Sequence, residues 1–116
     1  MTARRVLACG GRRYADYVKV CRELDALLTS GMKVLITGGA TGADELASRW
    51  AKDRAIPQII MPAAWDRLGP KAGPARNRWM LEYAVPDLVV AFPGGRGTDH
   101  MLLIARGAGI EAREVG

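Results

Sequence analysis

Residues 33–44, KVLITGGATGAD, decide the fold. The segment opens on an apolar run with the length of a buried strand, and the pair Gly38-Gly39 ends that run before a helical pattern begins. The same order of apolar run, glycine turn and helix recurs around residues 5–11 and 87–98. Strands that read as nearly unbroken apolar runs are typical of a parallel sheet covered on both faces. The sequence therefore predicts the α/β class, as a three-layer α/β/α Rossmann-like fold with a mainly parallel sheet of about five strands.

The expected elements alternate along the whole chain. A glycine at position 31 is the expected C-cap of the first helix, and the Gly- and Pro-rich stretch at 63–73 is expected to be an irregular loop. Pro74 suits the first turn of the helix that follows, because its missing N–H is not needed there. The predicted strands are 5–9, 33–37, 58–61, 87–92 and, weakly, 111–115, and the predicted helices are 14–28, 46–54, 74–83 and 98–105.

Length and composition set limits on the class of protein. The 116 residues fit one domain, taken as 1–116, and 49% apolar with 25% charged residues is a normal globular mixture rather than a disordered one. No apolar run approaches the roughly 18 residues of a membrane span, and Met1–Arg5 is not followed by the apolar stretch of a signal peptide. A cytoplasmic protein is the resulting expectation.

The net charge is +5, from 17 basic and 12 acidic residues. Such an excess admits a polyanionic partner but equally serves solubility. Single-stranded nucleic acid is possible but not favoured, because the basic residues are scattered and there is no row of aromatic side chains for base stacking. The glycine turns match neither the P-loop motif nor the spacing of the dinucleotide fingerprint, which disfavours those two classes.

The cysteines and the histidine do not form a metal-binding pattern. Cys9 ends an apolar run, Cys21 lies on an apolar helix face, and His100 is distant in sequence from both. Four-ligand zinc sites need more ligands than these. Both thiols are expected to be free and buried, and no metal and no cofactor are expected.

Three glycine-rich segments follow predicted strands, at 9–13, 37–44 and 93–100. Ligands of open parallel sheets bind beyond the carboxyl ends of the strands, so the three segments are expected on one rim. Glycine permits close approach of a ligand, and the following helix N-terminus offers unpaired N–H groups with partial positive charge. The set predicts a phosphate-binding site.

Two polar residues of these segments have alternative roles. Asp44 stands three residues after Thr41 in a capping-box-like arrangement, so it either caps the helix only or also orients the glycine turn or holds a ribose hydroxyl. Thr98 is a good N-cap residue whose hydroxyl equally suits a phosphate.

Side chains outside the glycine turns add further candidates. Arg76 and Arg78 point to different faces of one helix, so only one of them is expected in a site, where its fork suits a phosphate or carboxylate. Trp65 either stacks on a base or covers the core. His100 either acts as an acid/base group or merely forms a hydrogen bond near a helix N-terminus. Trp50 and Trp79 are expected to be packing residues, either within the fold or across a dimer contact.

Four strings in order carry a family resemblance over about residues 6–115: GGRRYAD, ITGGATGADELASRWA, PAAWDRLGPKAGPARNRWML and PDLVVAFPGGRGTDHM. The chain resembles the YspA/YpsA-related (cpYpsA-like) branch of the SLOG superfamily. Distant relatives in that superfamily are the LOG cytokinin-activating phosphoribohydrolases and the Rossmann-like domain of the DNA-processing protein DprA.

The resemblance implies a Rossmann-like fold that binds a nucleotide-derived ligand, such as a nucleoside monophosphate or an ADP-ribose-like molecule, and frequent homodimers. It implies that the glycine turns cradle phosphate and that Arg12 and Asp44 flank them. It also implies that Arg76 is the nearest match to an arginine of the LOG enzymes. The expected ligand-binding residues are Gly10, Gly11, Arg12, Gly38, Gly39, Thr41, Gly42, Asp44, Arg76, Gly94, Gly95, Arg96, Gly97 and Thr98.

One departure from the LOG pattern bears on catalysis. LOG enzymes resemble P-G-G-x-G-T-x-x-E, whereas this chain has Met101 at the glutamate position. A thioether does not handle a proton as a carboxylate does, and Asp99 lies about 200° around the helix from that position. Ligand binding or sensing is therefore the favoured function. The alternatives are cleavage of a nucleotide N-glycosidic bond, with Arg76, Asp99 or His100 as candidate catalytic residues, and single-stranded nucleic-acid binding.

Overall fold

The computed structural model describes residues 3–116, and their strands form one sheet. The sheet has the order β3-β2-β1-β4-β5, and every neighbouring pair is parallel. The first half of the chain thus builds one side of the sheet outward from β1, and the second half builds the other. The predicted α/β Rossmann-like architecture is confirmed. The strands are β1 (Arg5–Cys9), β2 (Val34–Thr37), β3 (Gln58–Ile60), β4 (Leu88–Ala91) and β5 (Glu111–Glu114).

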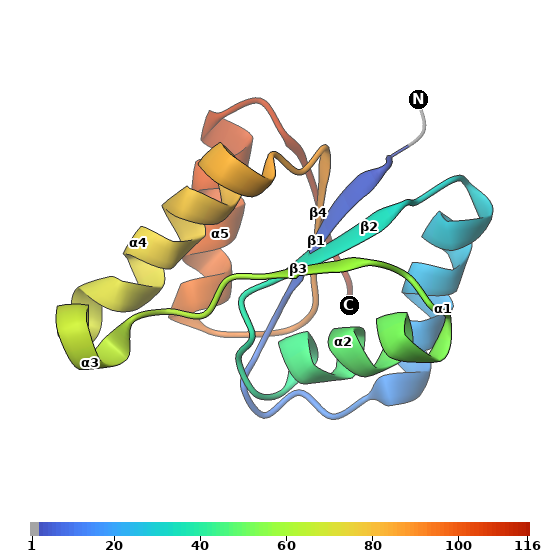
Figure 1. The fold of residues 1–116 in the computed structure, drawn as a ribbon, viewed down its shortest axis with the longest axis horizontal. Coiled ribbons are helices and arrows are strands. Elements are labelled where there is room, and N and C mark those ends of the chain that lie inside the picture. Colours follow the sequence, from blue (N-terminus) through green and yellow to red (C-terminus); the bar gives the residue numbers. More distant parts are fainter. Residues whose placement is uncertain (1–2) are drawn as a thin grey trace.

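Helices cover both faces of the sheet (Figure 1). Helices α1 (Tyr17–Thr29) and α2 (Ala43–Asp53) lie on one face. Helices α4 (Ala72–Trp79) and α5 (Arg96–Gly107) lie side by side on the other, and α4 continues into the π-helical segment η2 (Met80–Ala84). No helix within residues 3–116 is both long and apolar enough to cross a membrane.

Two hydrophobic clusters fill the space between the sheet and its helices. Successive residues of β1 alternate between them: Val6 and Ala8 join the cluster under α1 and α2, and Leu7 joins the cluster under α4 and α5. Because both faces are covered, the central strands need apolar residues at every position. The weakly predicted β5 is an edge strand with mostly exposed residues, which explains its charged sequence.

The stretch at 63–73 is not the irregular loop that its glycine and proline content predicts. It contains a short helix α3 (Trp65–Leu68) and a 3₁₀ turn η1 (Gly69–Lys71). Gly69 has φ of +58° between them, and Pro70 occupies the first turn of η1, so both residues serve helix termini. The next helix consequently begins at Ala72, two residues earlier than predicted.

Several helix boundaries also differ from the prediction. Tyr14 precedes α1, because Asp16 caps the helix by accepting a hydrogen bond from the Lys19 amide at 3.1 Å. Tyr14 instead packs against Phe92, with 5.5 Å between ring centroids. The C-cap of α1 is Ser30 rather than the predicted Gly31, which follows it with φ of +113°.

The two helices that follow glycine turns begin earlier than predicted. Gly42, not Thr41, is the N-cap of α2, and Gly95, not Thr98, is the N-cap of α5. In each case the chain enters the helix directly from its glycine turn, so the threonine is not at the cap position. Neither Thr41 nor Thr98 makes the capping hydrogen bond that the sequence suggested.

Candidate functional site

The three glycine turns meet at the carboxyl ends of β1, β2 and β4. The amide of Gly11 donates to the carbonyl of Pro93 at 2.9 Å, and the amide of Ala43 donates to the carbonyl of Gly11 at 3.0 Å. Gly42 has φ of +76°, and a Cβ there would stand 2.2 Å from the Gly11 oxygen. The close contact between turns therefore requires glycine, independently of any ligand.

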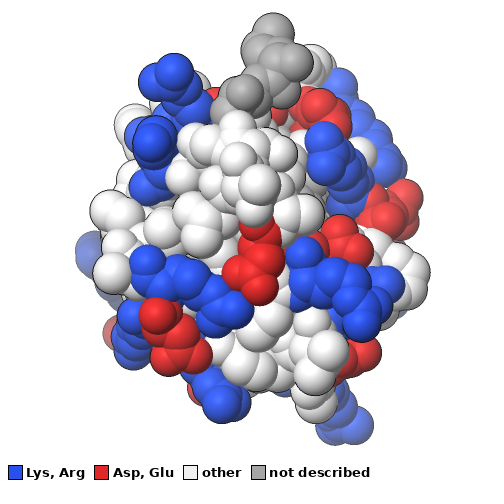
Figure 2. All heavy atoms as spheres, turned by 90° about the vertical axis from the view of Figure 1, so that its right-hand side faces the viewer, with Lys and Arg blue, Asp and Glu red and all other residues white. Residues whose placement is uncertain are grey.

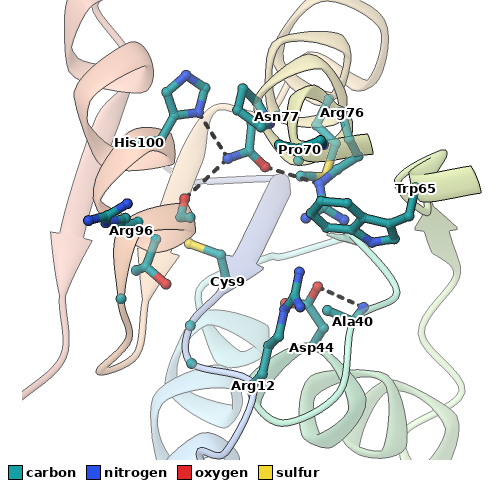
Figure 3. Close-up of a pocket in the computed structure, with 18 residues that line it drawn as sticks. Cys9, Arg12, Ala40, Asp44, Trp65, Pro70, Arg76, Asn77, Arg96 and His100 are labelled. Atoms are coloured by element: carbon teal, nitrogen blue, oxygen red, sulfur yellow. Dashed lines mark hydrogen bonds between the residues drawn. The ribbon is translucent and has the colours of Figure 1, made fainter. Parts of the chain in front are cut away.

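A cavity of about 570 Å³ opens beside the joined turns. Its volume falls within the usual range of small-molecule sites, roughly 300–1,000 Å³. Figure 3 shows side chains from β1, α2, α3, α4 and α5 pointing into it. It brings together most of the predicted site residues, namely Gly10, Gly11, Arg12, Asp44, Arg76, Gly95, Arg96, Gly97, Thr98 and His100.

The remaining predicted residues do not line this cavity. Gly38 and Gly42 are not among its lining residues, Thr41 is exposed, and Gly39 borders a separate depression between α2 and β3. The candidate catalytic residue Asp99 borders a third depression beside the end of β5, together with Gly94. Asp99 and His100 are thus adjacent in sequence but face different cavities.

Asp44 holds the second glycine turn from inside. Its Oδ2 accepts hydrogen bonds from the amides of Gly38 and Ala40, each at 3.1 Å. The amide of Gly39 donates to Oγ1 of Thr37 at 3.4 Å. Of the roles open to Asp44 at the sequence level, the structure shows orientation of the glycine turn. These turn amides bind the protein's own oxygens rather than pointing into the cavity.

Burial and charge act in opposite directions on Asp44. The residue is 5% exposed, and this burial raises the pKa of its carboxyl above the ordinary value. The amides of Ala40 and Gly38 and the guanidinium groups of Arg76 and Arg12 oppose that rise. Its second oxygen, Oδ1, accepts no hydrogen bond from residues 3–116, and the residue lines the cavity.

Arg76 is the arginine that turns inward from α4. Its Nη1 donates to the carbonyl of Gly38 at 2.7 Å, and its Nε donates to Oδ1 of Asn77 at 3.1 Å. A Cβ at position 38 would stand 2.1 Å from Nη1, so Gly38 makes room for the guanidinium. Burial lowers the pKa of Arg76 from its ordinary value. Arg78 is exposed and outside the cavity, so the two arginines diverge as the helical spacing predicts.

The first turn of α5 presents free N–H groups. Within residues 3–116, the amides of Arg96, Gly97 and Thr98 donate to no protein acceptor. A Cβ added at Gly95 or Gly97 would meet no atom within 4 Å, so nothing fills the space beside this turn. A 12-residue helix carries partial positive charge at this end, and the arrangement suits an anion.

Asn77 connects α4 to α5, and sequence reasoning did not assign it to the site. It is 5% exposed, and its Nδ2 donates to the carbonyl of Gly97 at 3.1 Å and lies 3.1 Å from Nδ1 of His100. Its Oδ1 accepts from Arg76, so all its polar atoms are engaged. The only sequence signal is its position next to Arg76, which gives no hint of burial.

These contacts define the state of His100. The Asn77 amide group is a donor, so Nδ1 of His100 must accept and the ring proton resides on Nε2. Burial, with a smaller effect from Arg78, lowers the pKa of His100 below its ordinary value. The imidazole in the cavity is therefore neutral at neutral pH.

Trp65 and Arg12 form one side of the cavity mouth. The guanidinium carbon of Arg12 lies 5.0 Å from the centroid of the Trp65 ring, a cation–π distance. Trp65 is 46% exposed and lines the cavity. A Cβ at Gly73 would stand 3.2 Å from Cη2 of the indole, so that glycine makes room for the ring.

Both cysteines are free, as predicted, although each is only partly buried. Cys9 lines the cavity rather than only the core, which the sequence did not indicate. Burial raises the pKa of the Cys9 thiol to about 12, with a smaller contribution from the charge of Asp44. Among residues 3–116 there is no group of three or more His, Cys, Asp or Glu placed to hold a metal ion.

The parallel sheet with helices on both faces defines a Rossmann-like α/β protein, and its cavity lies at the carboxyl ends of the strands. The model of the YAcAr family, the YspA, cpYpsA-related SLOG family, matches residues 4–68, and the chain belongs to this family. The predicted resemblance is confirmed. Gene 61 protein of Mycobacterium phage D29 is 40% identical to the chain over 117 residues, with 92% of each chain covered.

A solved structure gives independent support for the fold. The chain is similar to the C-terminal domain of a hydrogenase from Pyrococcus furiosus, with a TM-score of 0.59 and 18% sequence identity. The similarity covers 97% of this chain and 91% of that one. At this identity the likeness concerns the arrangement of helices and strands alone.

Proposed function

We propose that the protein binds a nucleotide-derived ligand, with a phosphate group on the first turn of α5. The single observation that carries the proposal is the set of unengaged amides at Arg96, Gly97 and Thr98, which line the same cavity as two further arginines. Backbone amides at a helix N-terminus are well suited to phosphate oxygens. Membership of a SLOG family agrees with nucleotide-related binding at the family level.

The charges around the cavity favour an anion. Arg12, Arg76 and Arg96 contribute positive charge, Asp44 contributes negative charge, and His100 is neutral at neutral pH. Arg96 is exposed and makes no hydrogen bond within residues 3–116, so its guanidinium is free to pair with a phosphate. Oδ1 of Asp44 supplies an acceptor suited to a hydroxyl group of the ligand.

Binding without turnover is the reaction class that we propose. Met101, at the position of the LOG glutamate, is 1% exposed and packs in the core under α4 and α5. Asp99, the alternative carboxylate, faces another depression. Neither side chain lies where a carboxylate would act on a sugar in the cavity. Release of a free base from a bound nucleotide would therefore contradict binding without turnover.

Nucleic-acid binding is not part of the proposal. Figure 2 shows the face that carries α1, where lysine and arginine side chains are interspersed with acidic ones and form no continuous basic stripe. A backbone-tracking surface for single-stranded nucleic acid needs such a stripe together with aromatic platforms. We further propose that the protein acts in the cytoplasm, as expected from its sequence.

A homodimer is a second element of the proposal. Trp79, Tyr83 and Leu103 are 39%, 67% and 71% exposed on the layer formed by α4, η2 and α5. Exposed apolar side chains on one layer are typical of a surface that another chain covers. Sedimentation equilibrium of the wild type and of Leu103→Glu tests this, and we expect a dimer that the glutamate converts to monomer. A monomeric wild type contradicts it.

Isothermal titration calorimetry tests ligand binding, with inorganic phosphate, ribose 5-phosphate, AMP and ADP-ribose as probes. We expect Arg96→Ala to weaken binding of the phosphate compounds by about tenfold or more, because charged hydrogen bonds are lost. Arg22→Ala is the control, since Arg22 is an exposed arginine on α1 that does not line the cavity. Chromatography of the same mixtures detects free base. Failure of all four compounds to bind at millimolar concentration contradicts the proposal.

A further inference from the structure

Trp65 stands on the far side of the cavity from the proposed phosphate position. Figure 3 shows Trp65 and Arg96 on opposite sides, with Asp44 and Arg12 below them and Asn77 above. A ligand with its phosphate at α5 and its sugar near Asp44 therefore extends toward the indole. The cavity volume of about 570 Å³ is large enough for a group at that end as well.

The indole is both accessible and supported. Almost half of its residue surface is exposed, at 46%, although its helix α3 places it beside the cavity. Gly73 on α4 leaves room for the ring edge, since a Cβ there would stand 3.2 Å from Cη2. A large aromatic side chain that is left uncovered at a cavity mouth and held at its edge is well suited to stack on another flat ring.

The guanidinium of Arg12 lies over the indole ring of Trp65. A base inserted between the two groups would need about 7 Å, which is twice a van der Waals separation of roughly 3.5 Å. The guanidinium carbon lies 5.0 Å from the ring centroid, so a base does not fit between them. A base that stacks on this face of the indole therefore has to replace Arg12, and this releases a positive charge inside the cavity.

We propose that Trp65 is the base-recognising wall of the site and that it selects purine nucleotides by stacking in place of Arg12. This inference rests on the proposed function, because it assumes that the phosphate is bound at α5. A purine presents a larger flat surface to the bicyclic indole than a pyrimidine does. Base stacking on an aromatic side chain changes affinity by about fivefold to a hundredfold.

Calorimetry with AMP, CMP and ribose 5-phosphate tests the inference on the wild type, Trp65→Ala and Trp65→Phe. We expect the wild type to bind AMP at least about fivefold more tightly than ribose 5-phosphate. In Trp65→Ala that preference, and the preference for AMP over CMP, should disappear while ribose 5-phosphate affinity is unchanged. Trp65→Phe should retain part of both. Leu68→Ala is the control, a partly exposed apolar residue on the same helix α3 that does not line the cavity.

The outcomes separate this inference from the proposed function. Equal wild-type affinities for AMP and ribose 5-phosphate would overturn the role of Trp65 and leave phosphate binding intact. Equal weakening of both compounds in Trp65→Ala and Trp65→Phe would show that the indole only supports the structure, which also overturns it. If neither these compounds nor inorganic phosphate bind the wild type, the proposed function and this inference fail together.

Discussion

Oδ2 of Asp44 lies 3.1 Å from the amide nitrogen of Gly38, and the same oxygen accepts from Ala40. A carboxylate on α2 thus takes up the amides that a glycine turn otherwise offers to an anion. The first turn of α5 has no such internal partner within residues 3–116. The two glycine turns therefore differ in purpose: one builds the wall of the cavity, and the other is open to a ligand.

Substitution of Asp44 separates its hydrogen bonds from its charge. In Asp44→Ala, two amides at a buried position lose their acceptor, which should lower the free energy of unfolding by about 2 kcal/mol or more. Asp44→Asn keeps an acceptor oxygen and should retain most of that stability. Because it removes the negative charge from the cavity, it should also bind inorganic phosphate more tightly. Urea unfolding and calorimetry measure the two effects.

One outcome would contradict the proposed role of the Asp44 hydrogen bonds. If the alanine and asparagine variants unfold at the same urea concentration, the contacts with Gly38 and Ala40 do not stabilise the turn. Glu45→Ala is a suitable control, since Glu45 is an exposed acidic neighbour on the same helix that lies outside the main cavity. Its substitution should leave stability and phosphate affinity close to those of the wild type.

Two glycines of the third turn make a matched pair. A Cβ at Gly94 would stand 2.2 Å from Oγ1 of Thr98 and 2.7 Å from the Gly11 amide nitrogen, whereas a Cβ at Gly97 meets nothing within 4 Å. Gly94→Ala should therefore cost about 1–3 kcal/mol of stability, as overpacked sites do. Gly97→Ala should be as stable as the wild type, since alanine is the better helix former.

For ligand affinity we expect the reverse order, so that Gly97→Ala weakens binding more than Gly94→Ala does. Gly97→Ala adds a methyl group beside the free amides and should weaken binding of AMP by several-fold in a fully folded protein. Calorimetry and thermal unfolding on both variants give the comparison. A Gly97→Ala variant with wild-type affinity would mean that no ligand approaches this turn closely, and the α5 position of the phosphate would then be wrong.

The fold could be predicted because its signals are local and repeated. Unbroken apolar strands such as those at 34–37 and 88–91 alternate with helical patterns, and glycine pairs follow β1, β2 and β4. The prediction of an irregular loop at 63–73 was wrong. Its glycine and proline residues end and begin short helical turns there, and composition alone does not distinguish such turns from irregular loop.

The site was predictable only in part, because its chemistry depends on contacts between distant residues. Glycine turns at strand ends identify the rim, but the sequence does not tell which amides already have partners. Asp44 engages those of its own turn, and Arg76 reaches 38 residues back to Gly38. The burial of Asn77 likewise follows from the packing of α4 on α5, which no local pattern specifies.

Cys9 is expected to be unreactive in the folded protein. With burial raising the pKa of its thiol to about 12, only about one molecule in ten thousand carries the thiolate at pH 8. Iodoacetamide should therefore modify Cys9 slowly in the native state and rapidly in urea. Mass spectrometry of a Cys21→Ser variant isolates the signal of Cys9. Equal rates in both states would show that the thiol is exposed and not desolvated.

His100 provides the last prediction, because it is the single histidine of the chain and its Hε1 resonance is free of overlap. Burial lowers the pKa of its imidazole in the folded protein, so between that pKa and about 6.5 the unfolded chain binds a proton that the native state does not. The neutral His100 therefore contributes fully to the free energy of unfolding above pH 6.5, and this contribution is lost as the pH falls through its lowered pKa. NMR titration should give a midpoint below 6.5, and added inorganic phosphate should raise it, since a nearby anion favours the imidazolium. A midpoint at or above 6.5 without phosphate would contradict the burial of the ring. A midpoint that phosphate leaves unchanged would contradict the anion site beside it.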